Sequence, residues 1–151
     1  MITTKQQISI CVINGYPKAS RDNFDLSGVG HPHNFFIDFL NRYIPSVRVT
    51  LCFAADSGDI LPAGHSIEHF DGIIWTGSDL TIFHLDDERV TKQIAFAKAV
   101  YEYGTPSYGS CWGIQMAAVA AGGEVEKNPR GREWSIGRDI HLTEDGKRSP
   151  F

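Results

Sequence analysis

The chain has 151 residues and a formal net charge of −4, with apolar and charged fractions that are ordinary for a globular protein. This length suits one domain and excludes a second, and the scattered basic residues form no stripe that could neutralise a nucleic-acid backbone. No apolar run approaches the roughly 20 residues that cross a bilayer, and the N-terminus lacks a secretory signal, so a cytoplasmic protein without membrane contact is expected.

The N-terminal third predicts a buried strand followed by a helix. Residues 8–13 form a nearly continuous apolar run, rich in β-branched residues and stopped by Asn14-Gly15, which favours a strand of a parallel sheet. A polar loop is expected to continue through Ser27. A helix is then predicted over residues 34–44, because apolar residues recur at helical spacing before Pro45. Its apolar positions are Phe35, Phe36, Phe39, Leu40 and Tyr43.

The middle of the chain predicts two strands and the best helix. Residues 47–53 and 71–76 have strand patterns, and the second of them is halted by Gly77-Ser78. Residues 86–103 predict a helix with acidic side chains at its start and Gly104 as its stop. The apolar stripe of this helix consists of Val90, Ile94, Ala97 and Tyr101.

The last third continues the alternation of strands and helices. A short strand is predicted over residues 106–110, and a helix of small residues over 112–121 ends at Gly122-Gly123. Residues 124–126 and 135–142 are expected to supply further strands. This order predicts a three-layer α/β fold with a mostly parallel sheet, in which ligands bind beyond the carboxyl ends of the strands.

The cysteine and histidine patterns argue against disulfides and metal. Cys11, Cys52 and Cys111 are an odd, widely spaced set with no C-x-x-C pair. His65 and His69 have the i, i+4 spacing of some zinc sites, but loop-like residues surround His65 and no glutamate follows it. No metal site is therefore predicted.

One segment carries a pattern for nucleophilic chemistry. Cys111 lies between Gly109 and Gly113, where a predicted strand passes directly into a predicted helix. This is the pattern of a nucleophile elbow, a sharp turn that needs small flanking residues and exposes the central side chain. The helix N-terminus would stabilise a thiolate, and backbone N–H groups there, starting with that of Trp112, could hold an oxyanion.

The pattern alone leaves a second interpretation open, because a free cysteine is more often a small buried hydrophobic residue. The strand before Cys111, the helix after it and a second strand that ends at Gly77-Ser78 favour the nucleophile. Cys11 and Cys52 have no such setting, and both are predicted to be strand side chains.

The segment around Cys111 resembles the class I glutamine amidotransferases, whose domain has a flavodoxin-like fold. Residues 106–115 resemble that family's strand, elbow and downstream glutamine, and residues 118–126 its following helix end and strand. Residues 71–78 resemble the strand that leads to the oxyanion loop. Residues 126–137 are similar to a subgroup close to the glutaminase part of GMP synthetase. The resemblance begins at Ile8 and covers nearly the whole chain.

The resemblance implies a reaction and a set of roles. Cys111 would attack the side-chain amide of glutamine, giving a glutamyl thioester and ammonia, and water would then release glutamate. Backbone N–H groups of Trp112 and of the Gly77-Ser78 loop would form the oxyanion hole, and Gln115 would help to hold the substrate. The alternative for Gln115 is a solvent-facing helix residue. No cofactor is implied, and the ammonia would pass to a synthetase domain or partner.

The resemblance also implies a base that the sequence does not supply. In this family a histidine of a His-x-Glu motif, oriented by its carboxylate, serves as base, and it lies beyond a further run of strands. We therefore expect residues 1–151 to form one domain of the family that is truncated at its C-terminal end. No base is assigned, because no spacing or neighbouring carboxylate singles out any remaining candidate. These candidates are His31, His33, His84 and His141.

Three functional hypotheses remain at this stage. The first is a glutaminase domain that supplies ammonia to a synthetase. The second is a related cysteine hydrolase that cleaves a γ-glutamyl amide or peptide without an acceptor. The third is a catalytically silent α/β module that binds a ligand or a partner.

Overall fold

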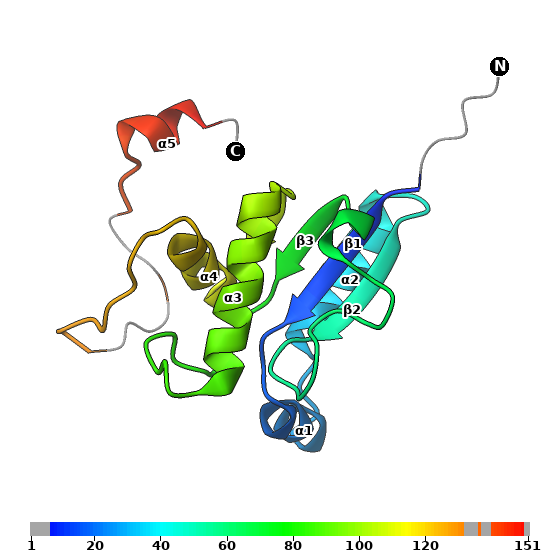
Figure 1. The fold of residues 1–151 in the computed structure, drawn as a ribbon, viewed down its shortest axis with the longest axis horizontal. Coiled ribbons are helices and arrows are strands. Elements are labelled where there is room, and N and C mark those ends of the chain that lie inside the picture. The colour runs from blue at the N-terminus through cyan, green and yellow to red at the C-terminus, as the bar shows by residue number, and fades with distance from the viewer. Residues whose placement is uncertain (1–6, 132–135, 137–139, 150–151) are drawn as a thin grey trace.

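The computed structural model describes residues 7–131, 136 and 140–149. Its centre is a four-stranded sheet in the order β2-β1-β3-β4, in which every pairing is parallel (Figure 1). The strands are β1 (Ser9–Asn14), β2 (Arg48–Phe53), β3 (Gly72–Trp75) and β4 (Ser107–Gly109). The predicted α/β fold of flavodoxin-like type is therefore confirmed, with β1 and β3 inside the sheet.

The strand register brings the carboxyl ends of the strands to one edge. Ile13 of β1 pairs with Trp75 of β3, and Trp75 pairs with Gly109 of β4. On the other side, Asn14 pairs with Phe53 of β2. The loops that follow β1, β3 and β4 consequently begin side by side, at the edge where ligands bind in sheets of this kind.

Helices cover both faces of the sheet (Figure 1). On one face, α2 packs against β1, while α3 and α4 pack against each other on the opposite face. The inner strands therefore have apolar side chains on both sides, as a parallel sheet requires. The helical elements are α1 (Lys18–Leu26), α2 (Pro32–Tyr43), the 3₁₀-helix η1 (Ile67–His69), α3 (Glu88–Tyr103), α4 (Trp112–Ala120) and α5 (Glu144–Arg148).

Three expectations about elements were wrong. The polar loop expected after β1 contains the helix α1. Its single buried residue is Arg21, so no stripe of buried apolar residues marks this helix in the sequence. Residues 124–126 form no strand; they follow the turn at Gly122-Gly123 with both glutamates exposed. Of the predicted strand 135–142, residues 136 and 140–142 are not strand, and the others lie outside the described residues.

The predicted helix faces were only partly correct. On α3, Val90 and Ala97 are buried, but Tyr101 is 61% exposed. Gln93 and Val100 take its place in the core. On α2, Leu40 is buried, whereas Phe35, Phe39 and Tyr43, which belong to the same helical repeat of apolar residues, are exposed. None of the described helices is long and apolar enough to span a membrane.

Candidate active site

Cys111 occupies the turn between β4 and α4. Its backbone has φ 54° and ψ −100°, a conformation that residues with a side chain rarely adopt, and its thiol group is on an exposed residue. Such a conformation costs about 1–3 kcal/mol and persists only where the surrounding structure imposes it. The strand-to-helix turn expected from the sequence is therefore present, and it holds the thiol outside the core.

The two glycines that flank the turn are required by close backbone contacts. A Cβ atom on Gly109 would lie 2.4 Å from the carbonyl carbon of Gly113. A Cβ atom on Gly113 would lie 2.6 Å from the Cβ atom of Trp75 on the neighbouring strand. Side chains at either position would push α4 away from the sheet, so these glycines allow the sharp change of direction at Cys111.

The side chain of Trp112 belongs to the core and not to the ligand side of the elbow. The residue is 1% exposed, and its indole Nε1 donates a 2.9 Å hydrogen bond to Oε1 of the buried Gln93. The Gln93 amide nitrogen donates in turn to the carbonyl of Arg89. The indole also packs on Gly15, where an added Cβ would meet it at 2.8 Å. Trp112 therefore fixes α4 to α3 and leaves its backbone N–H at the start of α4.

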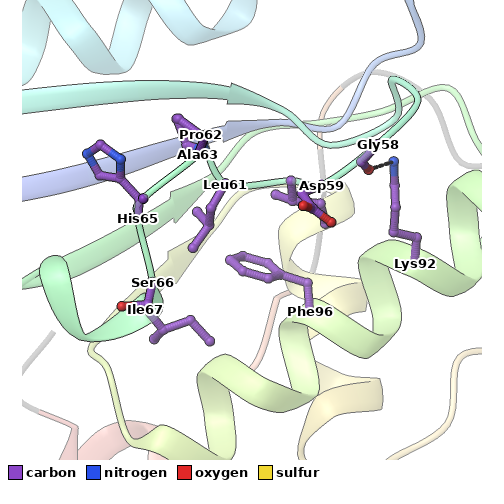
Figure 2. A pocket seen from close by; sticks show the side chains of 12 residues that line it. Gly58, Asp59, Leu61, Pro62, Ala63, His65, Ser66, Ile67, Lys92 and Phe96 are labelled. Carbon is purple, nitrogen blue, oxygen red and sulfur yellow. Dashed lines mark hydrogen bonds between the residues drawn. The ribbon is translucent and has the colours of Figure 1, made fainter.

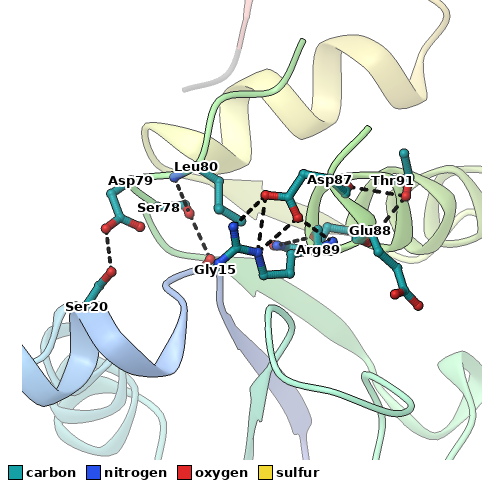
Figure 3. Close-up of polar contacts among 10 residues, drawn as sticks. Gly15, Ser20, Ser78, Asp79, Leu80, Asp87, Glu88, Arg89 and Thr91 are labelled. Carbon is teal, nitrogen blue, oxygen red and sulfur yellow. Dashed lines mark hydrogen bonds and ion pairs between the residues drawn. The ribbon is translucent and has the colours of Figure 1, made fainter. Parts of the chain in front are cut away.

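The loop after β3 is tied to the loop after β1 (Figure 3). The Thr76 hydroxyl accepts a hydrogen bond from the Gly15 N–H. The Ser78 hydroxyl donates to the Gly15 carbonyl at 2.8 Å. The Ser78 hydroxyl also accepts from the Leu80 N–H. The side chain of Ser78 is thus occupied in joining the loops, so a contribution of this residue to an oxyanion hole would come from its backbone.

Several backbone donors at this edge carry no acceptor. Among the described residues, no oxygen accepts a hydrogen bond from the N–H groups of Gly77, Ser78 or Trp112. Gln115 lies one helical turn beyond the elbow, and its half-buried side chain makes no hydrogen bond within the described part of the chain. The arrangement leaves backbone donors from two strand ends available to a ligand next to an exposed thiol.

Asn14 and Tyr16, which the sequence did not single out, complete this edge of the sheet. Asn14 is fully buried; its side chain accepts from the Tyr16 N–H at 2.9 Å and its amide nitrogen lies 2.7 Å from His33 Nδ1. Burial, followed by the nearby charges of Cys111 and Asp79, raises the pKa of Tyr16. The signal for both residues was their place at or just beyond the carboxyl end of β1, the end of a strand where ligands bind in such sheets.

The described histidines do not hydrogen-bond to the thiol. His31 donates to Asp25 at 2.8 Å, and His33 contacts Asn14. Burial, with the charges of His31 and Arg21 as smaller causes, lowers the pKa of His33. His84 lies against Phe83, and His141 is exposed. In the described structure, no histidine is therefore placed as a base for Cys111.

The other two cysteines are core residues, as predicted. Cys11 is 0% and Cys52 is 3% exposed, and their sulfur atoms lie 3.6 Å apart across β1 and β2 as free thiols. The hydrogen bond to Cys52, together with burial, raises the pKa of Cys11. Within residues 7–131, 136 and 140–149, no group of three or more His, Cys, Asp or Glu side chains could hold a metal ion.

The cavity of about 520 Å³ shown in Figure 2 lies away from the elbow. It is formed by residues 58–67 together with Lys92 and Phe96 of α3, and the Lys92 ammonium donates to the carbonyls of Asp56 and Gly58. None of the predicted site residues lines this cavity, so it does not enter the chemistry of Cys111.

Sequence comparison connects the chain to two kinds of enzyme. It is similar to a γ-glutamyl-L-1-hydroxyisopropylamide hydrolase from a Pseudomonas species, with 36% identity over 122 residues that cover 80% of this chain and 40% of that protein. It is also similar to the glutamine-hydrolysing GMP synthase of Symbiobacterium thermophilum, with 35% identity over 60 residues, 40% of this chain and 10% of that protein. A Nitratiruptor GMP synthase is 31% identical over 94 residues, 59% of this chain and 17% of that protein.

Structure comparison gives the same fold. The crystal structure of a glutamine amido transferase from Methylobacillus flagellatus matches with a TM-score of 0.55 and 24% identity, over 82% of this chain and 42% of that one. No protein-family model matches the chain. The chain spans less than half the length of the curated relatives it matches.

Proposed function

Because this chain belongs to the class I glutamine amidotransferase family, we propose that Cys111 is the nucleophile of a reaction that cleaves γ-glutamyl amides. The observation that carries the proposal is the exposed thiol held at φ 54° on the turn from β4 into α4. A buried structural cysteine has no need of this conformation, which raises its energy. The conformation is accounted for if it presents the sulfur to a ligand beyond the sheet edge.

The proposed reaction has two steps. The Cys111 thiolate attacks the γ-carbonyl carbon, and the carbonyl oxygen becomes an oxyanion held by N–H groups of Trp112 and of the Gly77-Ser78 loop. Collapse of the intermediate breaks the C–N bond; the nitrogen takes a proton and leaves as ammonia or an amine, and a glutamyl thioester remains. Water then attacks the thioester, which releases glutamate and restores the thiol.

Two substrates of this class are supported by different comparisons. The similarity to the γ-glutamyl-L-1-hydroxyisopropylamide hydrolase extends over 80% of the chain, which favours an N-substituted γ-glutamyl amide without any acceptor for the amine. The similarity to the two GMP synthases favours glutamine itself, with ammonia passed to a synthetase domain or partner. We place the hydrolase first because its similarity to this chain extends much further.

The proton-transfer half of the site determines which measurement to make. The reaction requires a base for the thiol proton, and no described histidine forms a hydrogen bond with Cys111. The loss of a base slows turnover by several orders of magnitude but leaves the nucleophile and its oxyanion donors in place. Covalent capture of Cys111 is therefore a sharper test than steady-state turnover.

The experiment treats the chain with a glutamine-like chloroketone and identifies the modified residue by peptide mass mapping. We expect one label, on Cys111, and protection by an excess of a γ-glutamyl alkylamide. A Cys111→Ala variant should take no label, although it retains Cys11 and Cys52 as an internal control for non-specific alkylation.

The same protein is then incubated with glutamine and, separately, with a γ-glutamyl alkylamide, and the bound glutamyl thioester is detected by intact mass. Acylation by the alkylamide and not by glutamine would favour the hydrolase, whereas the reverse would favour the glutaminase. The absence of both label and thioester would contradict the proposal and favour a silent binding module.

A further inference from the structure

Tyr16 lies at the ligand edge of the sheet with its backbone fixed from two sides. Its N–H donates to the side chain of the buried Asn14 at 2.9 Å. Its carbonyl oxygen accepts a 2.7 Å hydrogen bond from the guanidinium of Arg21, which also pairs with Asp56. The position of this residue after β1 is therefore set by buried partners and does not depend on the ligand.

The ring of Tyr16 is fixed as well, and its hydroxyl group is left available. The ring packs edge-on against Phe24, with centroids 5.1 Å apart. The hydroxyl oxygen lies against Gly77, where an added Cβ atom would come within 3.0 Å of it. Within the described part of the chain, this hydroxyl makes no hydrogen bond. A tyrosine held at both ends of its side chain therefore presents a free donor beside a residue of the proposed oxyanion hole.

The electrostatic setting keeps this hydroxyl a donor. Burial is the main cause that acts on the Tyr16 phenol, and the charges of a Cys111 thiolate and of the Asp79 carboxylate act in the same direction. All three causes raise the pKa of Tyr16, so the phenol stays protonated at neutral pH. The Asp79 carboxylate is itself a hydrogen-bond acceptor for Ser20 of α1 (Figure 3).

We propose that Tyr16 is a further catalytic residue of the reaction proposed for Cys111, whose hydroxyl donates a hydrogen bond to the γ-carbonyl oxygen as this oxygen becomes an oxyanion. The inference rests on the proposed function. It adds a side-chain donor from β1 to the backbone donors from β3 and the elbow. No proton is transferred in this step, because the phenol only stabilises the charge until the C–N bond breaks.

The size of the effect follows from the loss of one oxyanion donor, which typically slows the chemical step by about 10²–10³-fold. Tyr16→Phe removes the hydroxyl and keeps the ring that packs on Phe24. Tyr43→Phe is the matched control, since Tyr43 is exposed on α2 and lies outside the site.

The test compares two reagents on the full chain. The Cys111 thiolate displaces chloride from the methylene carbon of a glutamine-like chloroketone, and negative charge builds on the adjacent carbonyl oxygen, where the oxyanion donors lie. Methyl methanethiosulfonate has no carbonyl, so its reaction with the sulfur reports only on the thiolate. For Tyr16→Phe we expect the rate of chloroketone labelling to fall about 100-fold. The rate of methanethiosulfonate labelling should stay within about twofold of wild type, and its pH profile should be unchanged. For the control Tyr43→Phe, the rates with both reagents should match wild type.

The outcomes separate this inference from the proposed function. Wild-type rates of chloroketone labelling in Tyr16→Phe would overturn the role of Tyr16 and leave Cys111 as the nucleophile. If Tyr16→Phe lowers the labelling rate equally with both reagents, or shifts the pH profile with methanethiosulfonate, the hydroxyl acts on the Cys111 thiolate. Either result would overturn the oxyanion role. Failure of the chloroketone to label wild-type protein would overturn the proposed function and this inference together.

Discussion

Gly113, the second residue of α4, shows how strongly the elbow depends on single residues. Replacing a helical glycine by alanine ordinarily stabilises a helix by about 1 kcal/mol. Here the new methyl group would meet the Cβ atom of Trp75 at 2.6 Å, and neither atom can rotate away. Overpacking of this kind costs about 1–3 kcal/mol, and the rigid sheet favours the upper end. We expect Gly113→Ala to lower the free energy of unfolding in urea by about 1–2 kcal/mol.

Gly30 provides the matched control for this prediction. An added Cβ atom on Gly30 meets nothing within 4 Å and its φ is not positive, so Gly30→Ala should change stability by less than about 0.5 kcal/mol. The same Gly113→Ala protein should also react more slowly with the chloroketone, because displacement of α4 moves the Trp112 N–H. Equal stabilities of the two variants would contradict the packing account of the elbow.

Some residues of the candidate site could be predicted from the sequence, and others could not. The turn at Cys111 could be predicted because its requirements are local: a thiol, two small neighbours, and a strand and helix on either side. Tyr16 could not, because its role depends on contacts with Phe24 and Gly77, one of which comes from a distant strand end. The core position of the Trp112 indole depends in the same way on Gln93 of another helix.

At the scale of elements, the start of α3 carries a pH-dependent contribution to stability. Asp87 is its N-cap; the carboxylate accepts from the Arg89 N–H at 2.9 Å and pairs with the Arg89 guanidinium (Figure 3). The hydrogen bonds from Arg89 are the main cause that lowers the pKa of Asp87. Since the folded pKa lies below the unfolded value of about 3.9, the charge stabilises the fold above roughly pH 4 and loses this effect as the pH falls.

An Asp87→Asn variant isolates that charge, because asparagine is an equally good N-cap acceptor. We expect the variant to be less stable than wild type at pH 7 by about 0.5–1 kcal/mol, as is usual for an exposed ion pair, and the difference to shrink at pH 3. Urea unfolding at the two pH values measures this. Asp86→Asn is the control, since Asp86 is exposed and makes no ion pair or hydrogen bond among the described residues. A difference independent of pH would contradict the assignment.

The same scale shows why some elements were missed or misread. α1 could not be predicted from apolar periodicity because its buried residue is Arg21, which is held by Asp56 and by the ring of Phe53. On α3, Gln93 lies in the core because it accepts a hydrogen bond from Trp112. A search for apolar periodicity does not detect a core position that a polar residue occupies. In both helices a long-range polar partner replaces the apolar contact that sequence periodicity detects.

At the scale of the whole molecule, the strand order explains why the chemistry gathers at one edge. With β1 and β3 adjacent inside the sheet and β4 next to β3, the loops after all three strands meet. The parallel alternation of strands and helices could be predicted, and with it the edge where ligands bind. The pairing of particular loops could not, because it depends on contacts such as that of Gly15 with Trp112.

The same architecture predicts how the three thiols react. Cys111 is exposed, whereas Cys11 and Cys52 face the core between the sheet and α3. With a disulfide reagent such as Ellman's reagent, the folded protein should show one fast thiol, and the other two should react at least about 100-fold more slowly because the sheet must first open. Of the slow pair, Cys52 should react first, since β2 is an edge strand and β1 is an inner one.

Cys111→Ala should abolish the fast phase and leave the slow one unchanged, and a denaturant should make all remaining thiols fast. Two fast thiols in the folded wild-type protein would show that the β1–β2 side of the core is open to reagents, and would contradict the described burial. A slow Cys111 would contradict the exposed elbow on which the proposed chemistry depends. Because the reagent requires neither a catalytic base nor a substrate, the result reports on the fold independently of turnover.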